Sequence, residues 1–423
     1  MDRAEPTATA VPSGIPHVLV VGAGFAGMSA LEELRTLPVE VTLLDRNVFH
    51  TFQPFLYQVA TAGLNSGDVA YPARATVLQM PRTRFHLGEL GAVEWEDRKA
   101  LLADGQRLAY DYLILALGAS TNFFGIPGAE EHSLAIYTIH QALQVRDHVF
   151  TRLEERAACE PCTEPLRIVV VGGGPTGVEM AGTLAELRDA LVGFGYPELD
   201  RSDVRVVLVE MQDRTLGAFD ERLSRYAAAE LERRGVELRL GETVAEVRED
   251  EVLLSSGELL SCAVTIWAAG VRAPALAGAL GLTQGRSGRI AVDADLRPPG
   301  RPETFVAGDL SAAVMGDGLV PQLAQPAIQE GRHAARQIGR LLEGRPTEAF
   351  VYHDKGIMAT IGRRAAVLQL PIGVRLTGTL AWLGWLGLHI FTLVGRRNRL
   401  STLSNLAWRY VRWPRGVKVI VGS

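Results

Sequence analysis

The strongest constraint on the fold is a glycine-rich pattern that occurs twice. Near the N-terminus, "HVLVVGAGFAG" leads from a β-branched strand into residues 22–27, and "RIVVVGGGPTGVEMAG" repeats the arrangement at residues 172–177. A helical pattern follows each copy. Glycines at these spacings permit a tight turn and close backbone approach, and the N-terminus of the following helix faces a pyrophosphate. Each copy therefore predicts a βαβ unit that binds a dinucleotide.

An acid ends the second strand of each unit. Asp45 closes "VEVTLLD" twenty-one residues after Gly24, and Glu210 closes "VRVVLVE" thirty-six residues after Gly174. A carboxylate at this place accepts hydrogen bonds from ribose hydroxyls. The longer second spacing is attributed to an extended helix and the loop "GFGYPELDRSD". Glu210 would repel a 2′-phosphate, which favours NADH over NADPH, although the nearby Arg214 leaves NADPH open.

A later strand also closes each unit. "YDYLILALGAS" ends a strand at Gly118, and "AVTIWAAGVRA" ends one at Gly270, ninety-six and ninety-eight residues after the first glycine of the preceding turn. This spacing predicts an α/β fold with two Rossmann-like dinucleotide-binding domains, related by duplication as in glutathione reductase. Two dinucleotides in one chain imply a tightly held flavin and an exchangeable nicotinamide. "ETFVAGDLSAA" then places Gly308 and Asp309 where a carboxylate suits a flavin ribityl chain.

The length of 423 residues requires more than one hydrophobic core. We expect a disordered tail over 1–16, a discontinuous flavin-binding domain over 17–130 and 297–345, and a nicotinamide-binding domain over 131–296. A third, C-terminal region is expected over 346–423.

The C-terminal region is basic and apolar. Residues 355–423 contain eleven Lys and Arg and no Asp or Glu, although the whole chain has a net charge of −5. Such a region favours lipid or nucleic acid as its partner. Residues 376–395 carry no formal charge and could span a membrane by length, but their glycines, tryptophans and His389 favour a helix at the interface, followed by a cationic amphipathic companion. A core hairpin of helices is the alternative. The tail argues against a nucleic-acid-binding flavoprotein similar to apoptosis-inducing factor.

A "CEPC" motif could accept electrons from a reduced flavin. Cys159 and Cys162 precede the second glycine turn, roughly where thioredoxin reductases carry their redox pair. Their charged, proline-containing surroundings favour an ordinary surface loop, but a dithiol reductase stays the alternative function.

Three segments resemble the type II NADH:quinone oxidoreductases, the single-subunit alternative NADH dehydrogenases. They are "HTFQPFLYQVAT" at 50–61, "VPQLAQPAIQEG" at 320–331 and "YHDKGIMATIGR" at 352–363, and the resemblance runs from Val18 to about Ile420. It implies FAD in the first unit, NADH in the second and a non-electrogenic reduction of ubiquinone or menaquinone. It also implies a homodimer bound as a peripheral, monotopic protein to the cytoplasmic face of the cell inner membrane. The chain departs from the family at Leu117, where a Thr is usual, and at the two cysteines.

The resemblance and the glycine patterns together assign the site residues. For FAD they are Gly22, Ala23, Gly24, Phe25, Ala26, Gly27, Asp45, Arg46, Gln53, Val93, Ala116, Gly118, Gly308, Asp309, Ala324, Gln325 and Lys355. For NADH they are Gly172, Gly173, Gly174, Pro175, Thr176, Gly177, Glu179, Glu210, Ala269 and Gly270. For quinone they are Pro54, Tyr57, Gln325, Gln329 and Ile357, and no metal site is expected.

Three of these residues are assigned catalytic roles. The resemblance places Glu179 close to nicotinamide and flavin, although an acid early in a helix could simply complement its dipole. Lys355 could stabilise negative charge on reduced flavin, and Gln325 would line the path of the quinone. Lys355 and Glu179 are also candidates for proton delivery through water. The aromatics of 50–61 are expected to form an apolar wall between flavin and quinone.

Overall fold

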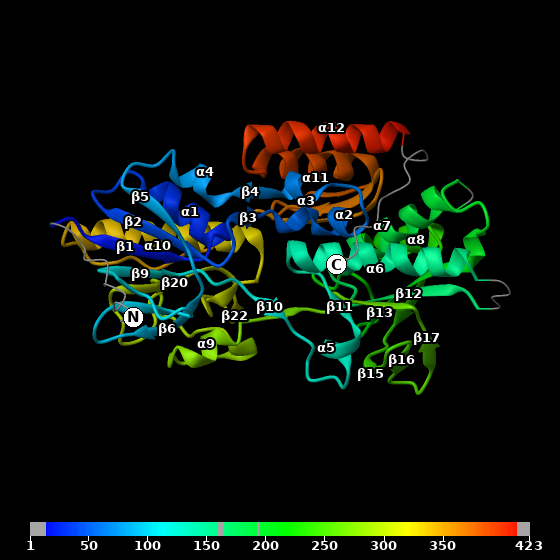
Figure 1. The fold of residues 1–423 in the computed structure, drawn as a ribbon, viewed down its shortest axis with the longest axis horizontal. Coiled ribbons are helices and arrows are strands. Elements are labelled where there is room, and N and C mark those ends of the chain that lie inside the picture. Colours follow the sequence, from blue (N-terminus) through cyan, green and yellow to red (C-terminus); the bar gives the residue numbers. More distant parts are fainter. Residues whose placement is uncertain (1–13, 160–163, 193, 413–423) are drawn as a thin grey trace, which may run out of the picture. The chain divides into compact units, whose positions relative to one another are not determined.

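The computed structural model describes residues 14–159, 164–192 and 194–412, and it divides the chain into two compact units (Figure 1). The first unit contains the chain up to His50, Tyr71–Ser120 and Val271–Asp354. The second contains Thr51–Ala70, Thr121–Gly270 and the chain from Lys355 onward. These units place 51–70, 121–130, 271–296 and 346–354 differently from the expected domains. All of the "HTFQPFLYQVAT" segment except His50 therefore falls in the unit that contains the second glycine turn.

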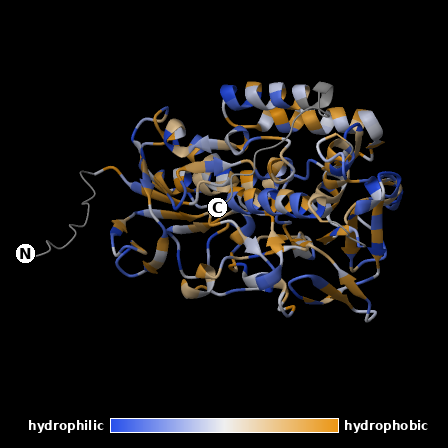
Figure 2. Ribbon diagram, turned by 45° about the vertical axis from the view of Figure 1, so that its right-hand side comes forward, coloured by the Kyte–Doolittle hydropathy of each residue, from blue (hydrophilic) through white to orange (hydrophobic). Residues whose placement is uncertain are grey.

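A parallel sheet with the strand order β20-β9-β1-β2-β5 forms the centre of the first unit. Its strands are β1 (His17–Val21), β2 (Glu40–Asp45), β5 (Thr83–Leu87), β9 (Tyr112–Leu115) and β20 (Thr304–Val306). The inner strands are runs of Val, Leu and Ile because helices and loops cover both faces of a parallel sheet. Figure 2 accordingly colours these strands mainly as hydrophobic.

The helices α1 (Phe25–Leu34) and α10 (Ala324–Leu342) pack closely in the first unit. The contact depends on small residues: a Cβ at Gly331 would lie 2.0 Å from the backbone oxygen of Ala26. Ala327 and Ala334 lie on the same buried face of α10. The helix that carries the "AQPAIQEG" sequence is therefore held directly against the helix that follows the first glycine turn.

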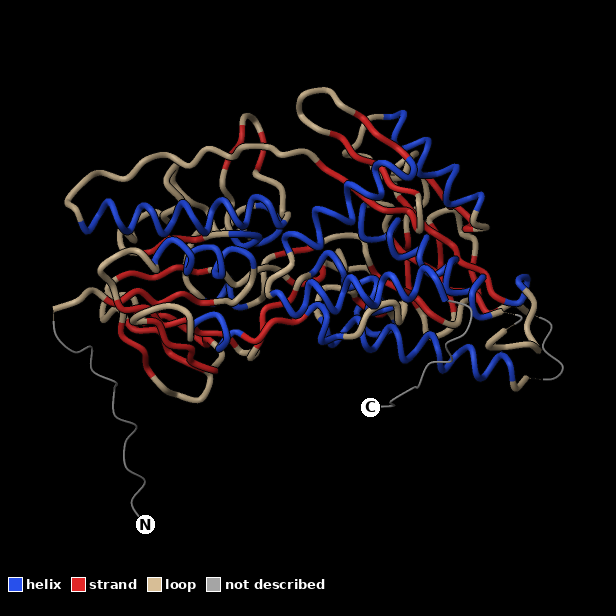
Figure 3. Tube along the Cα trace, turned by 90° about the horizontal axis from the view of Figure 1, so that it is seen from above, coloured by secondary structure: helices blue, strands red, loops and turns tan. Residues whose placement is uncertain are grey.

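The second unit repeats this design with the strand order β11-β18-β12-β13-β14. Its strands are β11 (Leu134–Ala135), β12 (Leu166–Val171), β13 (Val204–Glu210), β14 (Val236–Leu240) and β18 (Val264–Trp267). Its longer helices are α6 (Ile139–Ala157), α7 (Pro175–Leu191) and α8 (Glu221–Arg233). In each unit the helices flank the strands (Figure 3). The expected pair of Rossmann-like units is confirmed.

The duplication also includes a small antiparallel sheet. In the first unit it consists of β6 (Leu90–Glu94), β7 (Lys99–Leu102) and β8 (Arg107–Ala109). In the second it consists of β15 (Val244–Val247), β16 (Glu251–Leu254) and β17 (Leu259–Ser261). Both copies shift register within their first strand pair. In each unit this small sheet lies in the sequence between the βαβ pattern and the closing strand. Its presence in both copies explains why the distances from Gly22 to Gly118 and from Gly172 to Gly270 are nearly equal.

The chain after Lys355 forms an antiparallel sheet followed by two helices. The sheet consists of β23 (Ile357–Gly362), β24 (Ala365–Gln369) and β25 (Arg375–Thr377), and the helices are α11 (Gly378–Thr392) and α12 (Arg396–Arg412). Among the described residues, no helix has both the length and the apolar content to cross a membrane. The uncharged segment 376–395 is broken by the end of β25 and by the loop after α11.

Short elements complete the described fold. They are β3 (Phe49–Thr51), η1 (Gln53–Phe55), α2 (Leu56–Ala60), α3 (Ser66–Val69), β4 (Ala70–Pro72), α4 (Ala73–Val77), β10 (Ser120–Thr121), α5 (Ala129–His132), η2 (Arg201–Asp203), β19 (Val271–Arg272), α9 (Leu276–Ala279), η3 (Arg286–Gly288), η4 (Gly308–Leu310), β21 (Val314–Met315) and β22 (Gly318–Leu319).

Candidate functional site

The first glycine of each turn is crowded by the strand that closes its unit. Gly22 has φ +109°, and a Cβ there would lie 2.1 Å from the backbone oxygen of Ala116. Gly172 has φ +108°, and its Cβ would lie 2.6 Å from the Cα of Ala269. Positive φ and this crowding both require glycine. The closing strands predicted from their small-residue ends therefore press directly on the two turns.

The other two glycines of each turn have different functions. A Cβ at Gly27 or Gly177 would lie 1.8 Å from the backbone oxygen of the first glycine, so the third glycine brings helix and turn together. At Gly24 and Gly174 a Cβ would have no described atom within 4 Å. Both middle glycines are N-caps, of α1 and α7, and no side-chain cap occurs there in the described structure. Each turn therefore exposes helix N–H groups where a phosphate can approach.

The two acids bind the turns themselves. Asp45 Oδ2 accepts a hydrogen bond of 2.6 Å from the Ala23 amide, and Glu210 Oε2 accepts one from the Gly173 amide. A Cβ at Gly173 would lie 2.8 Å from the Cγ of Glu210. The second turn therefore combines Glu210 with Gly173, where the first turn combines the shorter Asp45 with Ala23. Burial raises the pKa of Asp45, and the bond from Ala23 opposes that rise. Each carboxylate keeps further lone pairs for ribose hydroxyls.

The two predicted glutamines of α10 differ in whether their side-chain oxygen can accept a hydrogen bond from a ligand. Both ends of the Gln329 amide bind the backbone of His353: its Nε2 donates to the His353 oxygen and its Oε1 accepts from the His353 amide, both at 3.0 Å. Gln325 Oε1 is buried, and no described residue donates to it. Gln325 can therefore accept a hydrogen bond from a cofactor or substrate, whereas Gln329 holds the segment that leads to Lys355.

The remaining predicted residues of the first unit have mixed surroundings. Gly308 begins the short helix η4 with φ +77°, and Asp309 follows it. Val93 lies in β6 within the hydrophobic core, whereas Arg46 is exposed and pairs with Glu89 at 3.4 Å. Val93 therefore contributes to the hydrophobic core, and Arg46 forms a surface ion pair.

Glu330 is a buried acid that the sequence analysis did not select. It lies on α10 with 1% of its surface exposed, and its Oε2 accepts a hydrogen bond of 2.7 Å from the Gly308 amide. The guanidinium of Arg289 and the Ser311 side chain both lower the pKa of this carboxyl. Burial nevertheless raises its pKa to about 8. Its spacing from Ala327 places it on the buried face of α10, a signal that periodicity could have given.

His50 also supports the first turn. Its Nδ1 donates to the Ala23 backbone oxygen at 2.8 Å, and its ring contacts Phe25 edge-on with 5.2 Å between centroids. The residue is 1% exposed, and burial lowers the pKa of its imidazole, which is therefore neutral. No described residue bonds its Nε2, which is an acceptor in this tautomer. The first residue of the "HTFQPFLYQVAT" segment thus fixes the backbone of the glycine turn.

Glu179 is a partly buried acid of the second unit. Its Oε1 accepts a hydrogen bond of 3.3 Å from the Thr360 amide. Burial raises the pKa of Glu179 to about 8, against the opposite effects of the Thr360 amide and the Trp385 side chain. The Trp385 ring, on α11, contacts Tyr57 with 6.1 Å between centroids and stacks on His389 at 4.2 Å.

The aromatic side chains of 50–61 are buried and pack against α11, and the wall between flavin and quinone stays a prediction. Phe55 lies 5.5 Å from Trp385 between centroids, and Phe52 lies 6.2 Å from His389. Gln53 Oε1 is buried, and no described residue bonds it. Pro54 is partly exposed, Lys355 is exposed, and Ile357 is the partly buried first residue of β23.

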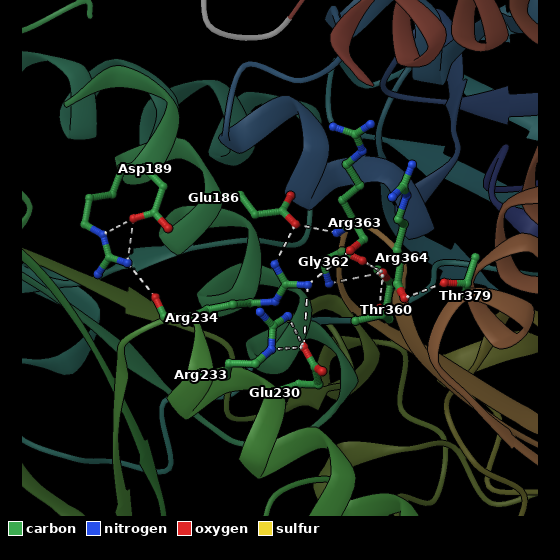
Figure 4. A network of polar contacts seen from close by, with 12 residues as sticks. Glu186, Asp189, Glu230, Arg233, Arg234, Thr360, Gly362, Arg363, Arg364 and Thr379 are labelled. Atoms are coloured by element: carbon green, nitrogen blue, oxygen red, sulfur yellow. Dashed lines mark hydrogen bonds and ion pairs between the residues drawn. The ribbon is translucent and has the colours of Figure 1, made fainter. Parts of the chain in front are cut away.

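A polar network fixes the β23–β24 hairpin on α7 (Figure 4). Glu186 accepts a hydrogen bond from the Arg363 amide and one of 3.0 Å from Arg234, whose guanidinium also donates to the Arg363 backbone oxygen at 3.1 Å. A Cβ at Gly182 would lie 1.9 Å from the Ile361 backbone oxygen. The helix that carries Glu179 and the strand that carries Thr360 are therefore held at a fixed distance.

The "CEPC" motif is only partly described. Cys159 follows α6, is exposed and is disulfide-bonded, and Cys162 lies outside the described residues. The dithiol function therefore stays the alternative prediction.

Comparison with known proteins places these features in a family. The pyridine nucleotide-disulphide oxidoreductase family matches residues 16–331. The type II NADH:quinone oxidoreductase Ndh of Mycobacterium tuberculosis is 35% identical over 95% of this chain and 89% of its own length. The type II NADH:quinone oxidoreductase of Staphylococcus aureus is 32% identical over 83% and 88%. The structure of NDH2 from Plasmodium falciparum in complex with NADH has a TM-score of 0.86 at 19% identity, covering 95% of this chain and all of its own, which shows the fold.

Glu330 should make stability depend on pH. Its pKa is raised from 4.5 to about 8 in the folded protein, so between these values the folded state holds a proton that the unfolded chain has released. Stability therefore falls as pH rises through this window. Glu330→Gln cannot ionise and still offers an oxygen to the Gly308 amide, so its thermal unfolding midpoint should fall less between about pH 5 and 8. The exposed Glu249→Gln should behave as the unaltered protein does, and an equal fall in Glu330→Gln would contradict this assignment.

Proposed function

The chain belongs to the pyridine nucleotide-disulphide oxidoreductases and, within them, to the type II NADH:quinone oxidoreductases, which oxidise NADH and reduce quinone, and we propose that it does so with a tightly bound FAD at a membrane surface. The observation that carries the proposal is the repeated open glycine turn. One chain offers two helix N-termini with an open middle glycine and an adjacent acid. That arrangement suits two dinucleotides.

The residues of the first unit fit FAD. The open position at Gly24 can admit a pyrophosphate, and Asp45 can accept from the adenosine ribose. The buried acceptors His50 Nε2 and Gln325 Oε1 lack donors among the described residues. The ribityl hydroxyls and the ring N–H of FAD are donors of the required kind. An orphaned buried acceptor costs about 1–3 kcal/mol, so a ligand that satisfies it binds more tightly.

The second unit is the place for NADH. Gly174 provides the open turn, and Glu210 lies beside it as the acceptor for a ribose hydroxyl. A 2′-phosphate would bring negative charge against that carboxylate, so we propose NADH as the donor. Arg214 is engaged by the Gly217 backbone oxygen at 3.0 Å, which reduces its value as a phosphate ligand.

When bound, FAD would supply the hydride and two-electron chemistry that connects NADH oxidation with quinone reduction. The residues of the chain would orient the reactants and donate protons. Glu179 holds a proton at neutral pH because burial raises its pKa to about 8, so it can supply one of the two protons that a quinol requires. Lys355 offers an exposed positive charge that can stabilise developing negative charge. Gln325 offers an uncharged acceptor. The homodimer and the identity of the quinone stay predictions of the family resemblance.

Gln325→Leu should separate the two half-reactions. Without its acceptor oxygen, we expect flavin reoxidation by a short-chain quinone to slow about tenfold, whereas flavin reduction by NADH should stay within about twofold. Anaerobic stopped-flow absorbance measures both steps. Gln329→Leu is the matched control, because its amide binds the His353 backbone; it should lower stability without selecting between the steps. An equal loss in both half-reactions of Gln325→Leu would refute the assigned role.

The membrane proposal rests on an unusual orientation of α12. Its inward face is polar: Asn398 donates to the Ala70 backbone oxygen at 2.7 Å, and Ser401 and Asn405 donate to Asp68 at 2.5 and 2.7 Å. Asp68 is 4% exposed, so these buried hydrogen bonds attach α12 to the rest of the second unit. The polar spacing is that of one helix face. An amphipathic helix in water would instead turn its apolar face inward.

The outward face of α11 and α12 is apolar. Among the described residues, ten of the twenty-one exposed large hydrophobic side chains lie between 372 and 408. They include Leu380 at 69%, Phe391 at 73% and Leu400 at 67% exposed. The exposed Arg396 and Arg397 stand at the N-terminus of α12, where the helix dipole disfavours cations. Exposed apolar side chains beside arginines suit the interface of an anionic bilayer.

Charges on this face should weaken membrane binding. Leu400→Glu with Leu403→Glu places two carboxylates among side chains that are 67% and 48% exposed, where folding does not need them. We expect partition onto phosphatidylglycerol vesicles to fall roughly tenfold or more, as measured by co-sedimentation. Leu78→Glu, at a position 85% exposed in the first unit, is the control and should bind normally. Unchanged binding of the double variant would exclude α12 as the membrane face.

A further inference from the structure

Phe124 is an exposed aromatic residue in an unfavourable backbone conformation. Its φ is +54°, and that of the next residue, Gly125, is +70°. The Ile126 amide closes the turn by donating to the Phe123 backbone oxygen at 3.0 Å. Tight turns with positive φ at both central residues usually carry Gly, Asn or Asp there, and a bulky side chain in this conformation is an outlier. The ring gains little from burial in return, because Phe124 is 60% exposed.

Specific hydrogen bonds hold this turn at the end of strand β18. Asn122 Oδ1 accepts from the Phe124 amide at 2.9 Å, and the Asn122 backbone oxygen accepts from the indole of Trp267 at 2.8 Å. The Asn122 amide donates to the Gly270 backbone oxygen at 3.0 Å. Phe123 packs against the Trp267 ring, with 5.7 Å between centroids. Backbone strain persists where the surroundings fix it in this way, and such places concentrate at ligand sites.

The Phe124 ring lies at the carboxyl edge of the second parallel sheet. A Cβ at Gly270, just after β18, would lie 3.3 Å from the Cζ of this ring. Trp267 of β18 pairs with Val171, the residue before the second glycine turn. On the other side of β12, strand β13 ends at Glu210. Along this edge the structure therefore presents, in order, the acid Glu210, the open glycine turn and the exposed phenyl ring.

We propose that the Phe124 ring is a contact for the nicotinamide riboside half of NADH. Ligands of a parallel sheet lie across the carboxyl ends of its strands. A dinucleotide whose adenosine ribose bonds Glu210 and whose pyrophosphate lies at Gly174 therefore continues toward β18, where the phenyl ring offers it a large apolar surface. This assignment rests on the proposed binding of NADH in the second unit.

The proposal gives the strain and the exposure of Phe124 one explanation. Glycine would adopt a φ of +54° without strain, but it would remove the ring from the edge of the sheet. A phenylalanine kept for folding would cost stability when replaced by glycine. A phenylalanine kept for binding should instead cost affinity for the nicotinamide half of the ligand and leave stability intact.

The direct test compares the binding of NAD⁺ and ADP to the oxidised holoenzyme by isothermal titration calorimetry. ADP has the adenosine and both phosphates of NAD⁺ but lacks the nicotinamide riboside. In Phe124→Gly, the Kd for NAD⁺ should rise roughly tenfold, whereas the Kd for ADP should stay within about twofold. The thermal unfolding midpoint should not fall, because glycine relieves the strain. Phe124→Tyr keeps the ring and should bind both ligands as the unaltered protein does.

Phe194→Gly is the matched control. Phe194 is 54% exposed in the same unit and follows the C-terminal end of α7, at the opposite end of that helix from the glycine turn. Its replacement should change neither Kd. An unchanged Kd for NAD⁺ in Phe124→Gly would overturn the proposal, whether or not the unfolding midpoint fell. An equal loss of affinity for NAD⁺ and ADP would also overturn it, because a general distortion of the site has that effect.

A second measurement covers the case in which Phe124→Gly does not fold. The holoenzyme is labelled with meta-fluorophenylalanine, and the ¹⁹F resonance of Phe124 is identified by its loss in Phe124→Tyr. The proposal requires saturating NAD⁺ to shift this resonance and saturating ADP to leave it in place. A resonance that does not respond to NAD⁺, or that responds equally to both ligands, would contradict it.

Flavin reduction then separates this proposal from the proposed function. If the unaltered protein bound no NAD⁺ and NADH did not bleach its flavin, the proposed function itself would fail. If NADH reduced the flavin of the unaltered protein and of Phe124→Gly with the same concentration dependence, the proposed function would stand and the assignment of Phe124 alone would fail.

Discussion

Both halves of the molecule depend on the absence of side chains at two glycine turns. A Cβ at Gly27 or Gly177 would lie 1.8 Å from the backbone oxygen of the first glycine in the turn, a distance that no packing change can relieve. The same close approach points the N-terminus of α1 or α7 at the open middle glycine. The sheets, the closing strands and the acids at Asp45 and Glu210 are all arranged around this contact. It therefore determines where a dinucleotide phosphate can be held.

Much of the fold follows from patterns that are local in the sequence. The two turns, the strands before them, the acids after them and the closing strands at Gly118 and Gly270 were predictable, because each depends on residue type and spacing. The small antiparallel sheets were not, because short strands such as β8 and β17 carry no distinctive pattern. The assignment of 51–70 to the second unit was also missed, since it depends on the packing of Phe55 and Tyr57 against α11, more than three hundred residues away.

The site was less predictable than the fold for a physical reason. Glu179 and Gln325 could be selected from motifs, but their surroundings depend on partners from distant segments, as with the bond from Thr360 to Glu179. His50 was missed because its burial depends on packing that the sequence does not show, whereas the spacing of Glu330 from Ala327 on α10 was a usable signal. The polar contacts of α12 could not be predicted, because their partner Asp68 lies more than three hundred residues earlier in the sequence.

We propose that this single chain takes electrons from NADH and delivers them to quinone through a flavin. The most direct test is anaerobic absorbance spectroscopy of the purified protein. One equivalent of NADH should bleach the flavin, and one equivalent of a short-chain quinone should restore its oxidised spectrum without any thiol partner. A flavin that NADH does not bleach, or one that a dithiol protein reoxidises while quinone does not, would contradict this proposal.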